Sequence, residues 1–353
     1  MQPDRTTHVR SGHDPRHQTV RAARLKARAT VRTVLLLVAI VSTVLTPWAD
    51  VWAQKTGKVH RVGVVFFGAA PRAPGPGMKA MTSRLAERGY VDGKNLVIDW
   101  RWAEGDYQRV PQLTADLVRS GADVIFTAGT RMSRIAQEAV KSTPLVVYSC
   151  DPFEHVARLA RHGSNVTGVT CMTTELSPKR LEMLKEAIPT AGRVVFLHEP
   201  EDAPLGLKLT QDAASRLGIK LPTVGFKARA DMPAALAAVA RERPDAIFVY
   251  PDPISGLERR QIAEFAVKER LPTMHAFREY VDAGGLMSYG ANTIDMLVLA
   301  SDQIAQILDG MRPGDIPVRQ ATRFELVINL KTAKALGVNI PRSLLLRADQ
   351  LIE

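Results

Sequence analysis

The sequence predicts an α/β protein with two doubly wound parallel-sheet lobes, joined by a hinge that the chain crosses several times. Short apolar runs rich in β-branched residues alternate with amphipathic stretches of helical period, which is the pattern of βαβ units. This alternating series occurs once before residue 150 and again after it. The 353 residues are enough for two domains with cores of their own.

The first series contains the stretch around which the chain is organised, residues 122–144. Val124–Phe126 is a continuous apolar run, as in a strand covered on both faces. Gly129 permits a sharp turn, and Thr130 is expected to cap the next helix. The elements expected in this series are strands at 59–67, 95–101, 123–127 and 145–149, with helices at 78–89, 111–120 and 130–141.

The second series begins after an extended run, 165–173, which we interpret as a crossing into the second lobe. Ser177 is expected to cap the helix that follows. The other expected elements are strands at 193–198, 221–226, 246–250, 272–277, 284–290 and 324–330, and helices at 203–217, 232–242, 255–270, 297–310 and 331–336. We therefore expect one lobe to comprise 58–152 plus 279–320, and the other 153–278 plus 321–353.

The formal net charge of +11 suggests nucleic-acid binding at first sight, but much of it is local. Residues 1–53 carry eight Lys and Arg and three Asp, and the remaining charge forms no basic block. A clustered basic face would be needed, so we expect no nucleic-acid partner.

The basic N-terminus precedes an apolar run at 34–45 that is too short for a comfortable transmembrane helix. Val51 and Ala53 suit a signal-peptidase site, so residues 1–53 are interpreted as a signal peptide and Gln54 as the mature start. An uncleaved anchor is the alternative. We expect a periplasmic protein without stable membrane insertion after cleavage.

Candidate ligand-binding residues follow the expected strands, because ligands of open α/β sheets bind at the carboxyl ends of strands. The free N–H groups at a helix start attract a carboxylate or phosphate, and an Asp accepts hydrogen bonds from an ammonium group. Aromatic side chains such as Phe67 and Tyr148 are candidates to cover an apolar ligand group. The expected ligand-binding residues are Gly68, Thr127, Gly129, Thr130, Ser149, Asp151, Glu199, Tyr250, Asp252 and Phe277.

We find no motif for catalysis, metal binding or cofactor binding. GxSxG, HExxH, GxxxxGK[ST] and GxGxxG are all absent from the sequence, and His198 and His275 have no spaced partner ligand. We therefore expect neither an enzyme nor a bound cofactor or metal. The two cysteines, Cys150 and Cys171, leave open either a disulfide or two separate thiols.

Several runs carry a family resemblance that extends over nearly all of residues 59–353. They are ERGYVDGKNL at 87–96, RWAEG at 101–105, NVTG at 165–168, GGLMSYG at 284–290 and FELVINLKTAKALGVNIPRSLLL at 324–346 with the following RAD. Together they resemble the ABC-transporter substrate-binding proteins related to the tryptophan/tyrosine-binding TrpX type. The resemblance implies a type I periplasmic binding-protein fold and no catalysis.

From this resemblance we expect an extracytoplasmic solute-binding component of an ABC importer. Its lobes would close around a small solute, with an aromatic or apolar amino acid as the first candidate, and deliver it to a membrane permease. The alternatives are a ligand-sensing protein that signals to a membrane partner and, less favoured, a hydrolase acting in the cleft.

Overall fold

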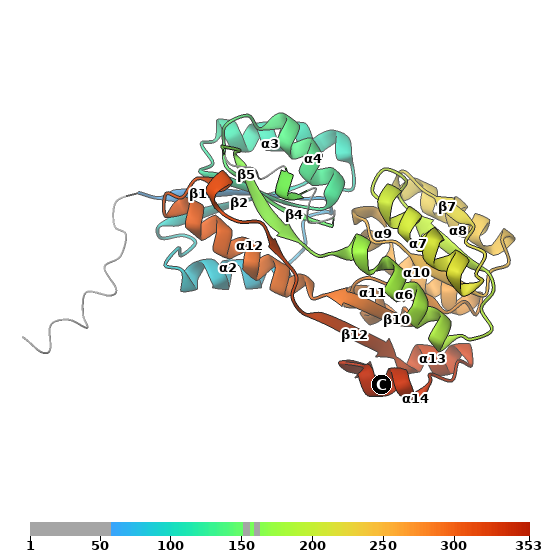
Figure 1. Ribbon diagram of the computed structural model, residues 1–353. Helices are drawn as coiled ribbons and strands as arrows, with labels where there is room; N and C mark the ends of the chain where they lie inside the picture. The colour runs from blue at the N-terminus through green and yellow to red at the C-terminus, as the bar shows by residue number, and fades with distance from the viewer. Residues whose placement is uncertain (1–57, 151–155, 159–162) are drawn as a thin grey trace, which may run out of the picture. The chain divides into compact units, whose positions relative to one another are not determined.

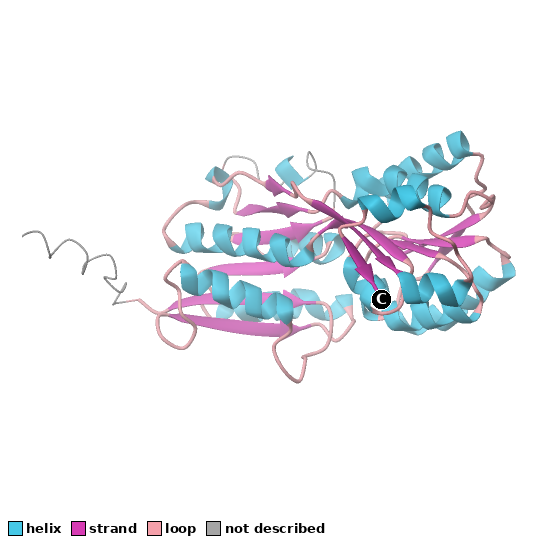
Figure 2. Ribbon diagram, turned by 90° about the horizontal axis from the view of Figure 1, so that it is seen from below, coloured by secondary structure: helices cyan, strands magenta, loops and turns pink. Residues whose placement is uncertain are grey.

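The protein is described from a computed structural model that covers residues 58–150, 156–158 and 163–353. The proposed signal peptide and Asp151 therefore lie outside the described residues. The structure contains two mainly parallel sheets, each covered by helices on both faces, which confirms the predicted α/β fold (Figures 1 and 2). Within the described part of the chain, no helix is long and apolar enough to cross a membrane.

The first sheet has six parallel strands in the order β11-β5-β4-β3-β1-β2. Helices α3 and α4 pack on one face, and α2 and α12 pack on the other (Figure 1). The strands are β1 (His60–Phe66), β2 (Leu96–Trp102), β3 (Val124–Ala128), β4 (Leu145–Ser149), β5 (Val166–Thr170) and β11 (Arg319–Gln320). The helices are α2 (Pro76–Glu87), α3 (Val110–Arg119), α4 (Thr130–Ala139) and α12 (Thr293–Leu308).

The second sheet has seven strands in the order β13-β12-β10-β9-β8-β6-β7, with β12 antiparallel to β10. Helices α6 and α7 cover one face, and α8 and α10 cover the other. The strands are β6 (Val194–His198), β7 (Thr223–Gly225), β8 (Ala246–Val249), β9 (Thr273–His275), β10 (Met287–Ala291), β12 (Phe324–Asn329) and β13 (Gln350–Ile352). The helices are α6 (Thr173–Ala187), α7 (Pro204–Leu217), α8 (Met232–Arg241) and α10 (Arg259–Lys268).

Shorter helices complete the second half of the chain: α9 (Pro253–Leu257), α11 (Arg278–Asp282), α13 (Leu330–Leu336) and α14 (Arg342–Arg347). Single 3-10 turns lie at Tyr107–Arg109, Arg229–Asp231 and Pro313–Asp315.

The chain passes between the sheets after β5, after β10 and after β11, as a multi-crossing hinge requires. Two strands differ from the expected lobe boundaries. β5 pairs with β4 and so belongs to the first sheet, and β10 pairs with β9 and β12 in the second. Strand partners are set by contacts distant in sequence, which the local pattern does not show. The expected lobes of Val166–Thr170 and Met287–Ala291 are corrected accordingly.

Two helix caps and one helix also differ from expectation. Gly129, with φ 109°, is the N-cap of α4, so Thr130 is its first helical residue. Helix α6 begins four residues before Ser177, whose hydroxyl instead donates to the Thr173 carbonyl at 3.0 Å. The expected helix 255–270 is divided at Glu258 into α9 and α10.

Candidate ligand-binding site

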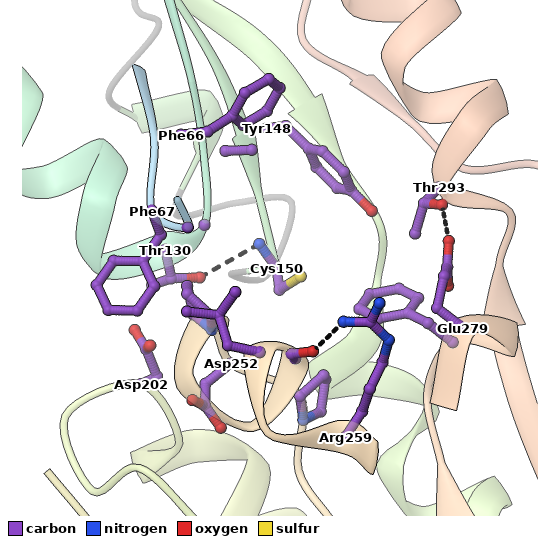
Figure 3. A pocket seen from close by; sticks show the side chains of 18 of the residues that line it. Phe66, Phe67, Thr130, Tyr148, Cys150, Asp202, Asp252, Arg259, Glu279 and Thr293 are labelled. Atoms are coloured by element: carbon purple, nitrogen blue, oxygen red, sulfur yellow. Dashed lines mark hydrogen bonds between the residues drawn. The ribbon is translucent and has the colours of Figure 1, made fainter. Parts of the chain in front are cut away.

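A cavity of about 500 Å³ lies between the strand ends of the first sheet and the α9–α11 region of the second (Figure 3). This volume is within the range of small-molecule sites. Residues from both halves of the chain line it: Phe66, Phe67, Gly68, Trp102, Gly129, Thr130, Tyr148 and Cys150 from the first, and Asp202, Tyr250, Asp252, Leu257, Arg259, Phe277, Glu279 and Tyr280 from the second. A ligand in this cavity would contact both halves.

Aromatic rings form the wall on the side of the first sheet. Phe66 stacks on Trp102 with ring centroids 5.4 Å apart, and Phe67 packs against Tyr107 at 4.4 Å. Figure 3 shows Phe66, Phe67 and Tyr148 around one side of the cavity. Such surfaces bury apolar and aromatic ligand groups through area and ring–ring contact.

Asp252 supplies a buried carboxylate to the opposite wall. It follows β8 between two prolines and caps α9, because its Oδ1 accepts from the N–H groups of Ile254 at 2.8 Å and Ser255 at 2.9 Å. Its Oδ2 is buried and has no hydrogen-bond partner in the part of the chain that the structure describes. Burial is the main cause that raises the pKa of Asp252 to about 7.

Asp202 brings a second carboxylate to the same region from the loop after β6. Its Oδ1 accepts from the backbone N–H of Arg131, the second residue of α4, at 3.1 Å, and its Oδ2 is buried with no partner among the residues described. Burial first, and then the charge of Asp252, raise the pKa of Asp202 to about 8. Among the described residues, neither of these two Oδ2 atoms has a donor. An unsatisfied buried acceptor is costly, so binding of a cation or a proton there would be favourable.

The start of α4 forms a third part of the site. The Thr130 hydroxyl accepts from the Cys150 backbone N–H at 3.2 Å, and it lies 3.4 Å from the Ser149 hydroxyl. Gly129 lies next to the second half of the chain: a Cβ placed there would be 3.0 Å from Cγ of Pro253. The positive end of the α4 dipole therefore faces the cavity region with little side-chain bulk in front of it.

Ion pairs join the two halves beside the cavity. The Arg131 guanidinium lies 3.4 Å from Oε1 of Glu199 and 3.3 Å from Oε2 of Glu201, and 4.2 Å above the Tyr107 ring. Arg134 donates to the Glu201 carbonyl at 3.0 Å. Glu199 is fully buried, and desolvation raises its pKa. These contacts hold the loop 199–202 against α4.

The sequence-predicted site residues fall into three groups. Those that line the cavity are Gly68, Gly129, Thr130, Tyr250, Asp252 and Phe277. Three do not line it. The Ser149 hydroxyl contacts the Thr130 hydroxyl, Glu199 pairs with Arg131 beside the cavity, and Thr127 is fully buried within β3. Asp151 lies outside the described residues.

Asp202 is the main residue that sequence reasoning missed. It lies three residues after Glu199, and acidic residues just after a strand were the signal that singled out Glu199. Asp202 and Glu199 both contact Arg131, which is distant in the sequence. These contacts decide which of the two carboxylates lies toward the cavity, so the local sequence does not distinguish Asp202 from Glu199. Phe66, Trp102, Arg259 and Glu279 also line the cavity without having been predicted to bind ligand.

Among the described residues, no group of three or more His, Cys, Asp or Glu side chains is arranged to hold a metal ion. His275 is buried against Tyr280, with ring centroids 4.8 Å apart, and desolvation lowers its pKa to about 3. His198 packs on Phe196 with centroids 5.2 Å apart, and burial lowers its pKa too. Both imidazoles are therefore neutral core groups at pH 7.

The family model of ABC transporter substrate binding proteins matches residues 76–352. The chain belongs to this family. It is a family of solute-binding proteins rather than enzymes, and its members act outside the cytoplasm as components of ABC importers. The resemblance predicted from the sequence runs is thereby confirmed.

Individual relatives agree with this assignment. A tyrosine-binding protein of Clostridioides difficile (strain R20291) is 24% identical over 265 residues, or 74% of this chain and 76% of the relative. A conserved domain protein from Vibrio cholerae has a solved structure that is 27% identical with a TM-score of 0.76, and the match covers 83% of this chain and all of that one. A Streptococcus structure with bound L-Trp is 25% identical with a TM-score of 0.74, covering 83% of this chain and 99% of the other.

Proposed function

We propose that this substrate-binding protein captures an aromatic amino acid of the tryptophan or tyrosine type in the cavity and delivers it to a membrane permease. The observation that carries the proposal is a cavity lined both by aromatic rings and by two buried acidic residues, Asp202 and Asp252, whose Oδ2 atoms have no partner among the described residues. The names of the C. difficile and Streptococcus relatives, which bind tyrosine and L-Trp, support the same ligand class.

The ligand's ammonium group would pair with Asp252 and Asp202. An ammonium has three donors, and the Oδ2 atoms of both residues lack a partner within the described residues. Binding the cation would favour the ionised carboxylates and offset the cost of burying them. The aromatic side chain would then lie against Phe66 and Tyr148.

The ligand's carboxylate has two cationic or dipolar partners among the cavity-lining groups. Thr130 lies at the positive end of α4, and Arg259 offers a guanidinium from the start of α10. Figure 3 shows Arg259 reaching the cavity from the side opposite Thr130.

Closure of the two halves follows from ligand contacts on both sides. The cavity-lining residues come from both halves, so a ligand would bind the closed state better than an open one. The ion pairs of Arg131 with Glu199 and Glu201 join the two halves, so they would form or break with the same motion.

We also infer that residues 1–53 direct export and that the mature protein works in the periplasm. The supporting observations are the basic and apolar pattern of this segment and the extracytoplasmic role of the family.

A thermal-shift screen of the purified protein with the twenty amino acids, sugars and nucleobases tests the ligand class. A ligand at a thousand times its Kd adds about 4 kcal/mol to the free energy of unfolding, enough to raise Tm by several degrees. We expect shifts with L-tryptophan and L-tyrosine, and none with sugars. The largest shift with a sugar or nucleobase would overturn the proposal.

Analogues then separate the two charged ends of the ligand. Tryptamine lacks the carboxylate and indole-3-propionate lacks the ammonium. We expect both to bind more weakly than L-tryptophan, and indole-3-propionate to bind worst because it meets two acidic side chains. Equal affinity for L-tryptophan and both analogues would show that the cavity recognises only the indole ring.

A further inference from the structure

The two cysteines are brought together by strand pairing. Cys150 directly follows β4, and Cys171 directly follows β5. These strands are parallel neighbours whose last aligned pair is Ser149 and Thr170, so the cysteines occupy the next position of the register. The backbone N–H of Cys171 donates to the Ser149 carbonyl at 3.2 Å, which continues the pairing to the cysteines.

This register suits a covalent bond. Adjacent strands lie about 4.8 Å apart, and disulfides join Cα atoms about 4.4 to 6.8 Å apart. The two Sγ atoms are in contact at 2.7 Å. The bond therefore requires side-chain adjustment but no displacement of the strands.

The surroundings give the two sulfurs different accessibility. Cys150 is partly exposed and lines the ligand cavity, whereas Cys171 is fully buried. The sulfur of Cys171 lies 3.1 Å from the Thr173 hydroxyl, and the buried Arg180 guanidinium donates to the Thr173 carbonyl at 2.9 Å.

These neighbours favour the thiolate of Cys171. Burial works against it, but hydrogen bonding with Cys150 and Thr173 and the positive charge of Arg180 together lower the pKa of the Cys171 thiol. A thiolate is the attacking species in disulfide exchange.

We propose that Cys150 and Cys171 form a disulfide in the exported protein, at the first crossing between the sheets and in the wall of the ligand cavity. The proposal rests on the export part of the proposed function, because disulfides persist in oxidising compartments. It does not depend on the identity of the ligand.

The oxidant is a disulfide of the compartment, represented in the test by oxidised glutathione. The Cys150 thiolate attacks it, forming a mixed disulfide and releasing one glutathione thiolate, which takes up a proton. The Cys171 thiolate then attacks the sulfur of Cys150 and releases the second glutathione. Two cysteine thiols have lost two electrons and two protons, and one glutathione disulfide has become two thiols.

The bond would fix a residue that already ties several cavity elements together. The Cys150 N–H donates to Thr130, and the Cys150 carbonyl accepts from the Thr174 hydroxyl at 3.1 Å. Thr174 in turn lies 3.0 Å from the hydroxyl of Tyr250, a cavity residue of the second half. Reduction would leave this junction held by hydrogen bonds alone.

Thiol counting tests the proposal. The purified full chain is equilibrated with oxidised and reduced glutathione, unfolded with a maleimide probe present, and weighed by mass spectrometry with and without prior reduction. We expect no probe on the unreduced protein, which is two hydrogens lighter, and two probes after reduction. Two probes on the unreduced protein, or glutathione retained on Cys150, would overturn the proposal.

Stability gives a second readout. The cysteines are 21 positions apart, and closing a loop of this size predicts that reduction lowers Tm by about 5 °C. The double variant C150S/C171S is the matched control, and its Tm should not respond to the reductant. An equal response in wild type and control would contradict the proposal. Thiol counts and ligand affinity are measured separately, so failure of one idea leaves the other testable.

Discussion

Replacing Asp252 by Asn removes the charge proposed to hold the ligand ammonium while preserving the local fold. The Asn side-chain oxygen can still accept from the backbone N–H groups of Ile254 and Ser255, as Oδ1 does in the structure. What changes is the outer oxygen, which has no partner in the described residues and becomes an NH₂ group. We therefore expect an effect on ligand affinity rather than on folding.

The magnitude follows from one charge-assisted hydrogen bond. Such a bond contributes about 1.5 to 3 kcal/mol, which corresponds to a Kd about 10- to 150-fold higher for L-tryptophan. Tm in the absence of ligand should be equal or higher, because the variant no longer buries a carboxylate whose pKa is raised by desolvation.

Isothermal titration of wild type and variant with L-tryptophan measures this effect. D231N is the matched control: Asp231 also accepts backbone N–H groups, from Lys227 and Ala228 at 2.9 Å, but it is exposed and lies outside the cavity lining. Unchanged affinity in D252N, or an equal loss in D231N, would refute the assignment of Asp252 to the ammonium.

The same carboxylates predict how pH acts on the protein. An unfolded Asp loses its proton near pH 4, whereas folded Asp252 and Asp202 keep theirs to about pH 7 and 8. The folded state binds more protons across this window, so stability without ligand should fall as pH rises from 4 to 8. An ammonium ligand prefers the ionised carboxylates, so its affinity should rise between pH 6 and 8, by at most about tenfold per pH unit for each proton released.

Three further outcomes follow. Titration in buffers of different ionisation enthalpy should detect proton release on binding at pH 6.5; no release would contradict the paired carboxylates. G129A should weaken L-tryptophan binding at least tenfold, because a Cβ at this position meets Pro253 and φ is 109°. G218A, with φ 67° and no atom within 4 Å of the added Cβ, controls for backbone strain alone. Equal affinity of the two variants for L-tryptophan would contradict a role for the contact between Gly129 and Pro253. R131Q should raise the Kd for L-tryptophan about threefold to tenfold in low salt, because it breaks the ion pair with Glu199. This loss of affinity should be smaller in high salt, and a loss that does not depend on salt would argue against an ionic role.

The fold was predictable because its signals are local. Apolar strands and amphipathic helices alternate along the chain, and the parallel βαβ arrangement follows from that alternation. The sheet to which an extended segment belongs is not a local property. β5 was read as a crossing because nothing in 165–173 reveals that it pairs with β4 before the chain leaves the first sheet.

The lining of the cavity was predictable where it consists of residues at strand ends. Gly129, Thr130 and Asp252 each follow a buried strand, and all three line the cavity. Asp202 was missed because its inward position depends on the Arg131 backbone, which is 71 residues away. The cysteine pair illustrates the same limit. The register of β4 and β5 brings the two sulfurs together, and the spacing of the cysteines in the sequence does not predict this contact.

The central claim, that the cavity binds an aromatic amino acid, is tested most directly by isothermal titration of the purified protein with L-tryptophan, L-tyrosine and L-leucine. The protein should first be unfolded, dialysed and refolded to remove any ligand that copurified. We expect saturable one-to-one binding of an aromatic amino acid, at least tenfold tighter than that of L-leucine. Refolded protein that binds neither aromatic amino acid, or binds L-leucine as tightly, would contradict the account.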